Sequence, residues 1–166
     1  MATSDNLKTA FAGESQANRT YLAFAKKAAR DGFPGIARLF RAAAAAETVH
    51  AHAHLRVMGG VKDTAENLRA AIAGEAHEFR TMYPEFLQEA EMTGDKAAAL
   101  SFRYALAVEK IHHDLYAEAL AAFESGRDVP TADMWVCEIC GHTIRGEAPD
   151  KCPVCGAARE KYAKVE

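Results

Sequence analysis

Apolar and polar residues along positions 4 to 125 follow the three-and-four spacing of amphipathic helices. Clusters of Gly, Pro and Asp at 31–35, 59–63, 93–95 and 125–130 divide this stretch into four long segments rich in Ala, Leu, Glu, Lys and Arg. The pattern predicts four helices, antiparallel within each of two hairpins. Asp63 and Glu66 have the spacing of a capping box before the third helix. Pro84 should kink that helix or distort its hydrogen bonding.

Residues 131–166 differ in character from the helical part. They follow a linker containing Pro and Asp, and they hold all 4 cysteines of the chain as two CxxC pairs. We therefore predict a helical domain at 1–130 and a small metal-binding domain at 131–166.

Composition and charge narrow the functional classes. A formal net charge of -3, with Lys and Arg spread singly, gives no basic patch for nucleic acid. We find neither a run of about 18 apolar residues nor a cationic start followed by an apolar core. We therefore expect no membrane segment, no export signal and a cytoplasmic location. In that compartment, paired cysteines favour metal binding over disulfides.

An internal repeat is the most informative feature of the helical part. FRAAAAAETVH (40–50) and FRYALAVEKIH (102–112) share the pattern FRxxxxxExxH at an offset of 62. GESQANRT (13–20) and GEAHEFRT (74–81) share GExxxxRT at an offset of 61. Each hairpin therefore carries a Glu on one helix and a Glu-x-x-His on the next.

This repeated set is the dinuclear metal constellation of ferritin-like helix bundles. A single Glu-x-x-His usually belongs to an exposed, salt-bridged helix face. Solvent exposure alone does not explain why two Gly-Glu pairs and two Glu-x-x-His pairs repeat in register. On the fourth helix, His112 and His113 can both reach a metal beside Glu109, and the repeat favours His112. The predicted ligands are Glu14, Glu47, His50, Glu75, Glu109 and His112.

Helix geometry separates the three histidines of ETVHAHAH (47–54). His50 lies about 60° and one turn from Glu47, whereas His52 lies about 140° away and should be solvated. His54 lies on the same face, but about 10 Å along the axis from Glu47, too far to share one metal centre.

Glu78 breaks the repeat, because its counterpart in the first hairpin is Ala17. With Glu78 the site has five carboxylates and two neutral imidazoles, a charge of -5 that is costly to bury without cations. Two divalent ions nearly neutralise it. Oxygen-rich ligation with two imidazoles suits iron or manganese.

The C-terminal pattern is CxxCG, eleven residues, CxxCG, which predicts a tetrathiolate site made by Cys137, Cys140, Cys152 and Cys155. These residues alone leave zinc and iron open, but an oxygen-rich two-metal site elsewhere in the chain favours iron as an electron-transfer partner. We expect Trp135 and Tyr162 to pack this small core, and His142 and Lys151 to be solvated.

On these motifs the chain resembles the rubrerythrin family over essentially its whole length. The residues that carry the resemblance are Gly13-Glu14, Glu47 to His50, GEAHEFRTMYP, Glu109 to His112 and the CxxCG pair. The resemblance implies an all-α fold, a ferritin-like four-helix bundle followed by a small rubredoxin-like metal-binding domain. It also implies a non-haem diiron peroxidase of oxidative-stress defence. Such an enzyme reduces hydrogen peroxide to water with electrons from a reductase partner, ultimately from a reduced nicotinamide.

The same resemblance implies the cofactors and the roles of individual residues. Two irons would occupy the carboxylate site and one iron the cysteines, although zinc also fits four thiolates. Glu14 would serve one iron, with His50 in the reduced state or Glu78 in the oxidised state. Glu75 and His112 would serve the other, and Glu47 and Glu109 would bridge. Tyr21 and Tyr83 would orient carboxylates.

Two rival interpretations remain open at this point. A ferroxidase or iron-storage protein would use the same bundle, but it needs no dedicated tetrathiolate domain for electron entry. A zinc-ribbon scaffold on an inert bundle would use the cysteines alone.

The connection GGVKD (59–63) raises a question about the oligomer. If the second and third helices run parallel, as the resemblance implies, a crossover between the sites would span roughly 33 Å. Six residue steps reach only about 20 Å. Unwinding of the helix ends or a plain up-down-up-down bundle would remove the conflict. Our preferred hypothesis is a homodimer whose hairpins are domain-swapped.

Overall fold

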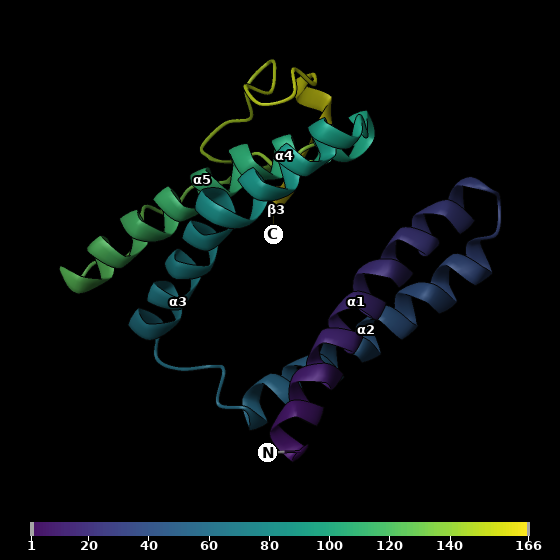
Figure 1. Cartoon of the computed structure of the whole chain (residues 1–166), viewed down its shortest axis with the longest axis horizontal. Helices are drawn as coiled ribbons and strands as arrows, with labels where there is room; N and C mark the ends of the chain where they lie inside the picture. Colours follow the sequence, from purple (N-terminus) through teal and green to yellow (C-terminus); the bar gives the residue numbers. More distant parts are fainter. Residues whose placement is uncertain (1, 166) are drawn as a thin grey trace. The chain divides into compact units, whose positions relative to one another are not determined.

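The computed structural model describes residues 2–165 and forms two compact units. The first unit, which ends at Lys62, contains α1 (Ala2–Arg30) and α2 (Pro34–Val57). The second starts at Asp63 with α3 (Thr64–His77), a π-helical turn η1 (Glu78–Met82), α4 (Tyr83–Thr93) and α5 (Lys96–Glu124) (Figure 1). The four predicted helices are therefore present, the third being the continuous run α3–η1–α4.

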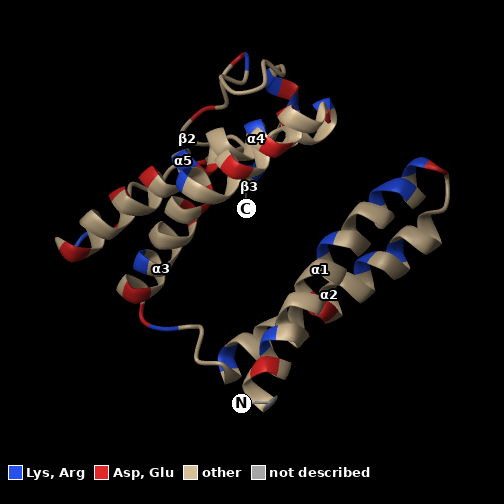
Figure 2. Ribbon diagram, in the orientation of Figure 1, with Lys and Arg blue, Asp and Glu red and all other residues tan. Residues whose placement is uncertain are grey.

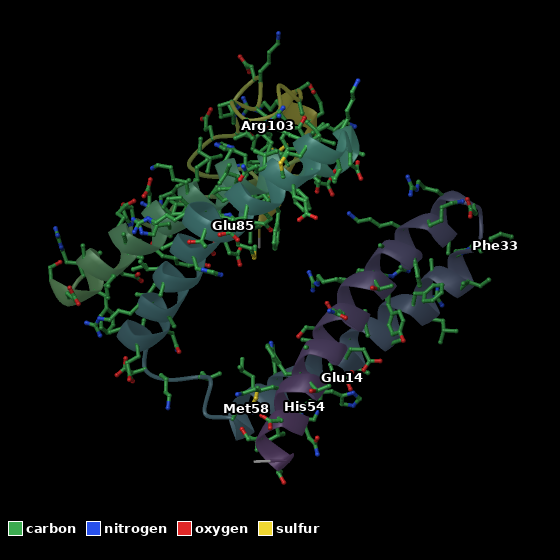
Figure 3. The ribbon with its side chains drawn as sticks, in the orientation of Figure 1. Glu14, Phe33, His54, Met58, Glu85 and Arg103 are labelled. Atoms are coloured by element: carbon green, nitrogen blue, oxygen red, sulfur yellow. The ribbon has the colours of Figure 1, made fainter. Side chains whose placement is uncertain are left out.

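The first unit is a helical hairpin. Gly32 adopts a φ of 86° in the turn, a left-handed conformation that favours glycine. Pro34 opens α2, where its missing N–H costs no hydrogen bond. The Phe33 side chain at this turn is 55% exposed (Figure 3).

Small residues hold the two helices of the first unit close together. Ala37, Ala44 and Ala51 recur one heptad apart on α2 and are buried. Asn18 of α1 is only 6% exposed. Its Nδ2 donates to the Ala44 carbonyl at 2.6 Å and to the Thr48 hydroxyl at 2.8 Å. This pair of hydrogen bonds fixes the register between α1 and α2 one turn beyond Glu14.

In the second unit, α3–η1–α4 packs along α5. Asp63 caps α3 by accepting a hydrogen bond from the Glu66 N–H at 2.8 Å, as the capping-box pattern predicts. Gly94 ends α4 with a φ of 73°, and the Asp95 carboxylate then caps α5. The predicted distortion near Pro84 is confirmed, because η1 ends two residues before it.

The C-terminal part of the second unit is a three-stranded antiparallel sheet of order β2-β1-β3. Its strands are β1 (Met134–Cys137), β2 (Thr143–Arg145) and β3 (Tyr162–Val165), and the short 3-10 helix η2 (Arg159–Lys161) precedes β3. Trp135 and Tyr162 pack its core, as predicted. The Arg145 guanidinium of β2 pairs with Glu118 of α5 at 2.7 Å, so this sheet contacts α5 directly.

Lys and Arg as well as Asp and Glu occur in both units, as Figure 2 shows. Exposed ion pairs such as Arg69–Glu124 at 2.6 Å contribute little to stability, because solvent screens them. Across residues 2–165, none of the helices combines the length and apolar character needed to span a membrane.

Candidate metal centres

The first hairpin brings together Glu14 of α1 with Glu47 and His50 of α2. His50 Nδ1 lies 3.0 Å from Glu47 Oε2 and 3.8 Å from Glu14 Oε2. One ligand atom from each side chain lies within 4.8 Å of the others, so the three can share one ion. We call this group the first triad. His52 is exposed, as predicted, and His54 is outside the triad.

The second hairpin repeats this arrangement with Glu75 of α3 and Glu109 and His112 of α5, which we call the second triad. His112 Nδ1 lies 2.8 Å from Glu109 Oε2 and 4.0 Å from Glu75 Oε2. His113 is outside the triad, and its Nδ1 faces Asp114 at 2.9 Å. Burial and then the charge of Glu109 raise the pKa of Glu75, because the carboxylates are crowded together. Such crowding favours a bound cation.

Glu78 lies near the second triad but outside its 4.8 Å group. Burial and then the charge of Glu75 raise the pKa of Glu78. Glu78 is the first residue of the π-helical turn η1, a type of turn that is frequent at functional sites. The backbone that presents this additional carboxylate therefore differs locally from an α-helix.

The π-helical turn also accounts for the change of offset within the repeat. The offset is 61 up to Thr20 and Thr81, but Tyr21 and Tyr83 are 62 apart, so the second hairpin has one additional residue at Met82. A π-turn closes i→i+5 hydrogen bonds and can absorb one residue without ending the helix. The α-helix on either side of η1 therefore keeps the phase of the first hairpin.

The two predicted tyrosines lie in different surroundings. Burial raises the pKa of Tyr83, and the charges of Glu78, Glu109 and Glu75 raise it further, so its hydroxyl lies near the carboxylates. Tyr21 packs its ring against Phe40 with centroids 6.2 Å apart. Tyr83 therefore shares the electrostatic environment of the carboxylates around the second triad.

The four cysteines converge on one point between β1, the following turn and the turn at 152–156. All four sulfur atoms lie within 4.8 Å of one another, and no disulfide joins them among the described residues. The Sγ atoms of Cys137 and Cys155 are 3.7 Å apart, and those of Cys140 and Cys152 are 3.5 Å apart. A tetrahedral metal with bonds of about 2.3 Å needs sulfur separations near this length. The donor set therefore fits a tetrathiolate metal.

Glycines after the second cysteine of each pair shape this site. Gly141 and Gly156 adopt φ values of 84° and 74°, which glycine reaches without steric cost. Burial opposes ionisation of Cys152, but hydrogen bonds from the Tyr162 hydroxyl and the N–H groups of Cys155 and Val154 hold its pKa at about 6. Burial raises the pKa of Cys140, so the metal-free site favours a thiolate at Cys152 rather than at all four cysteines.

One hydrogen bond that sequence reasoning missed connects the cysteine domain to the second triad. The Thr143 hydroxyl on β2 donates to the Gly141 carbonyl at 3.0 Å, and its oxygen lies 2.8 Å from His112 Nε2. Since the single hydroxyl proton is already used, Nε2 carries the imidazole proton and donates to Thr143. A neutral His112 then presents an Nδ1 lone pair 2.8 Å from Glu109 Oε2, and this contact requires a cation or a second proton.

His142 corrects the expectation of a solvated side chain, whereas Lys151 is exposed as expected. His142 is only 6% exposed, and its Nδ1 lies 2.7 Å from the Tyr162 hydroxyl. The sequence signal was weak, because a histidine in a short turn gives no periodicity from which burial can be inferred.

Removing metal should expose the electrostatic cost of the second triad. The raised pKa of Glu75 means that the folded metal-free protein gains stability as pH falls through this pKa. Glu75→Gln should therefore raise the melting temperature of chelator-treated protein by a few degrees at pH 7, and the gain should shrink toward pH 4.5. Thermal unfolding followed by circular dichroism checks this, with Glu89→Gln on the exposed face of α4 as control. An equal gain at both pH values would contradict the crowding of charge.

Comparison with known proteins agrees with this geometry. The family model described as rubrerythrin matches residues 5–120, and the model of the rubrerythrin rubredoxin-like domain matches residues 135–163. Rubrerythrin-2 of Clostridium acetobutylicum is 34% identical, over 96% of this chain and 95% of the relative. Nigerythrin of Nitratidesulfovibrio vulgaris is 35% identical, over 97% of this chain and 85% of the relative.

The solved structures of nigerythrin are similar as well. The partially reduced state has a TM-score of 0.59 and 31% identity, covering 98% of this chain and 86% of the nigerythrin chain. The predicted fold class is confirmed, and the chain carries the Glu and His groups of a diiron carboxylate-type site together with a four-cysteine rubredoxin-like site. The chain belongs to the rubrerythrin family.

Proposed function

We propose that this protein is a non-haem diiron peroxidase that reduces hydrogen peroxide with electrons received through iron at the four cysteines. The balanced reaction consumes one H2O2, two electrons and two protons, and it yields two molecules of water. The observation that carries the proposal is the His112 ring, which joins a carboxylate triad through Nδ1 and the cysteine domain through Nε2. Family membership in a group of diiron oxidoreductases supports it.

In this proposal the two triads together, with Glu78, hold two irons. Glu47 and Glu109 would be ligands shared by both ions, and the charge of the ions would neutralise the crowded carboxylates. The chemistry that bound iron supplies is the stepwise delivery of two electrons to the peroxide O–O bond. Iron at the cysteines would accept one electron at a time from a reductase or another redox protein.

Residues of this chain orient the ligands and handle protons. Thr143 fixes the tautomer of His112, so that Nδ1 is available as a ligand. Tyr83 lies near three carboxylates and restrains their rotation. Glu78 and His50 would be alternative ligands of one iron, since a carboxylate suits the ferric state and an imidazole the ferrous state.

A ferroxidase or iron-storage protein is the alternative, because the carboxylate ligands would be the same. The cysteine domain favours the peroxidase, since storage of iron needs no electron-entry domain hydrogen-bonded to a ligand histidine. The two functions differ in stoichiometry. A peroxidase returns to its starting state and loses no iron, whereas a ferroxidase accumulates ferric iron with each oxidation.

We also propose that the protein is a cytoplasmic homodimer with swapped hairpins. Supporting this, α2 continues to Val57 and α3 begins at Thr64, so unwinding of the helix ends does not lengthen the connection. Large apolar side chains are exposed in each unit, including Leu39 at 69%, Val57 at 71% and Met92 at 73%. Apolar surface of this kind marks faces that another part of the assembly covers.

Glu78→Ala tests the peroxidase and the role of Glu78 together. The variant should keep two irons in the carboxylate site, because six ligands remain, but its chemically reduced form should be re-oxidised by one equivalent of peroxide about tenfold more slowly. Stopped-flow absorbance measures the rate, and metal analysis checks iron content. Glu85→Ala on the following turn is the control. Wild-type protein that failed to react with stoichiometric peroxide would refute the peroxidase, and an unchanged variant rate would refute the role of Glu78.

Thr143→Val tests electron entry through His112. Loss of the hydroxyl removes the hydrogen bond to Nε2, so re-oxidation of the reduced cysteine-bound iron by the oxidised carboxylate site should slow by about tenfold, while Thr143→Ser should restore it. The bleaching and recovery of the ferric-thiolate visible band report this step. Thr93→Val on α4 serves as control. Equal rates in Thr143→Val and wild type would mean that electrons take another route.

Complementation tests the swapped dimer. Chains carrying Glu14→Ala and chains carrying Glu75→Ala should each lack an intact diiron site as homodimers. In a swapped heterodimer both defects fall in one site and the other site is intact, so a co-refolded mixture should recover up to half of the diiron content per heterodimer. Heterodimers isolated by two affinity tags that contain no diiron site would rule out the swap.

A further inference from the structure

A buried pair beside the four cysteines takes no part in the function proposed above. His142 and Tyr162 are 6% and 7% exposed, and their rings meet edge to face with centroids 5.9 Å apart. His142 Nδ1 and the Tyr162 hydroxyl are 2.7 Å apart. The His142 backbone is fixed as well, because its carbonyl accepts a hydrogen bond from the Cys137 N–H at 2.9 Å.

The phenol of Tyr162 lies within the cysteine core. Tyr162 belongs to the same buried cluster as Cys137 and Cys152, and its hydroxyl is hydrogen-bonded to the Cys152 sulfur. A phenol, whose ordinary pKa is about 10, is protonated at neutral pH and can act as the donor.

The positions of the protons follow from counting donors. Tyr162 has one hydroxyl proton, and a thiolate sulfur can only accept. The hydroxyl therefore donates to Cys152 Sγ, and its oxygen accepts from His142 Nδ1–H. The reverse direction would turn a phenol lone pair toward a thiolate in a buried core and leave the sulfur without this donor. A neutral imidazole has a single N–H, and this arrangement places it at Nδ1, 2.7 Å from the phenol oxygen.

We propose that His142 is a positioning residue that holds the Tyr162 hydroxyl proton on Cys152 Sγ, and that this hydrogen bond raises the reduction potential of iron bound by the four cysteines. Ferric iron with four thiolates carries a charge of -1, and ferrous iron carries -2. One electron enters, no bond breaks and no proton moves. A donor to sulfur stabilises the more negative state. The inference rests on the proposed assignment of iron to this site.

The test is a spectroelectrochemical titration of the full, iron-reconstituted chain, in which the ferric-thiolate visible band reports the oxidation state. Tyr162→Phe keeps the ring and removes the hydroxyl. It should shift the reduction equilibrium about tenfold toward the ferric state, or about 59 mV for a one-electron couple. His142→Phe should shift it in the same direction, and His142→Asn, which restores an N–H donor near the position of Nδ1, should return it toward wild type.

Two further measurements separate this role from a structural one. If His142 acts through Tyr162, the double variant should have the potential of Tyr162→Phe alone, because the effects of coupled residues do not add. Wild type should also show a deuterium-sensitive Fe–S stretching frequency in resonance Raman spectra that Tyr162→Phe loses. Tyr116→Phe on α5 is the control for removal of a hydroxyl.

A wild-type potential in Tyr162→Phe would overturn the inference, and so would an additive double variant. The reduction potential and the Fe–S stretching frequency are both measured without peroxide turnover. A protein that binds iron at its cysteines but fails to reduce peroxide would therefore refute the proposed function while leaving the inference standing. A wild-type potential in Tyr162→Phe together with normal peroxide turnover would refute the inference and leave the proposed function standing.

Discussion

Repulsion between carboxylates that share one face of a hairpin is the constraint that the rest of the structure satisfies. Two unit charges 4 Å apart repel by about 4 kcal/mol at an effective dielectric constant of 20, and each triad holds two carboxylates within 4.8 Å. Packing elsewhere has to hold them together. In the first hairpin, the heptad-spaced alanines and the buried Asn18 fix the register of the helices near Glu14. The backbone therefore assembles the ligands in advance, and cations relieve a strain that already exists.

Local signals in the sequence predicted the helices and most of the candidate ligands. Asp63 caps α3 because three-residue spacing to Glu66 is a property of one helical turn. Glu47 with His50 and Glu109 with His112 lie together for the same reason, since residues i and i+3 share a helix face. The π-helical turn was also detectable, because Pro84 follows it and the repeat offset changes from 61 to 62 between Thr81 and Tyr83.

Features that depend on contacts between distant segments could not be predicted in this way. The hydrogen bond between His112 and Thr143 joins a helix to a strand 31 residues later, and no periodicity relates such positions. His142 was expected in solvent, but it is buried because Tyr162 approaches it from a strand 20 residues further along. Asn18 has no counterpart in the repeat, since Phe79 occupies the matching position, so its buried amide gave no pattern. Burial of a polar side chain cannot be predicted from the sequence until its hydrogen-bond partner is known.

The additional residue at Met82 has a consequence for how the two halves of the chain diverged. A duplicated segment begins as two equal copies, and an insertion in a regular α-helix would rotate every later residue by about 100° around the axis. The turn η1 confines that rotation to five residues, so the aromatic packing beyond it survived the change. An insertion absorbed in this way alters one copy at a single level of the helix, beside Glu78, and leaves the helical phase of the remainder unchanged. The asymmetry between the two hairpins is thus confined to one turn of backbone.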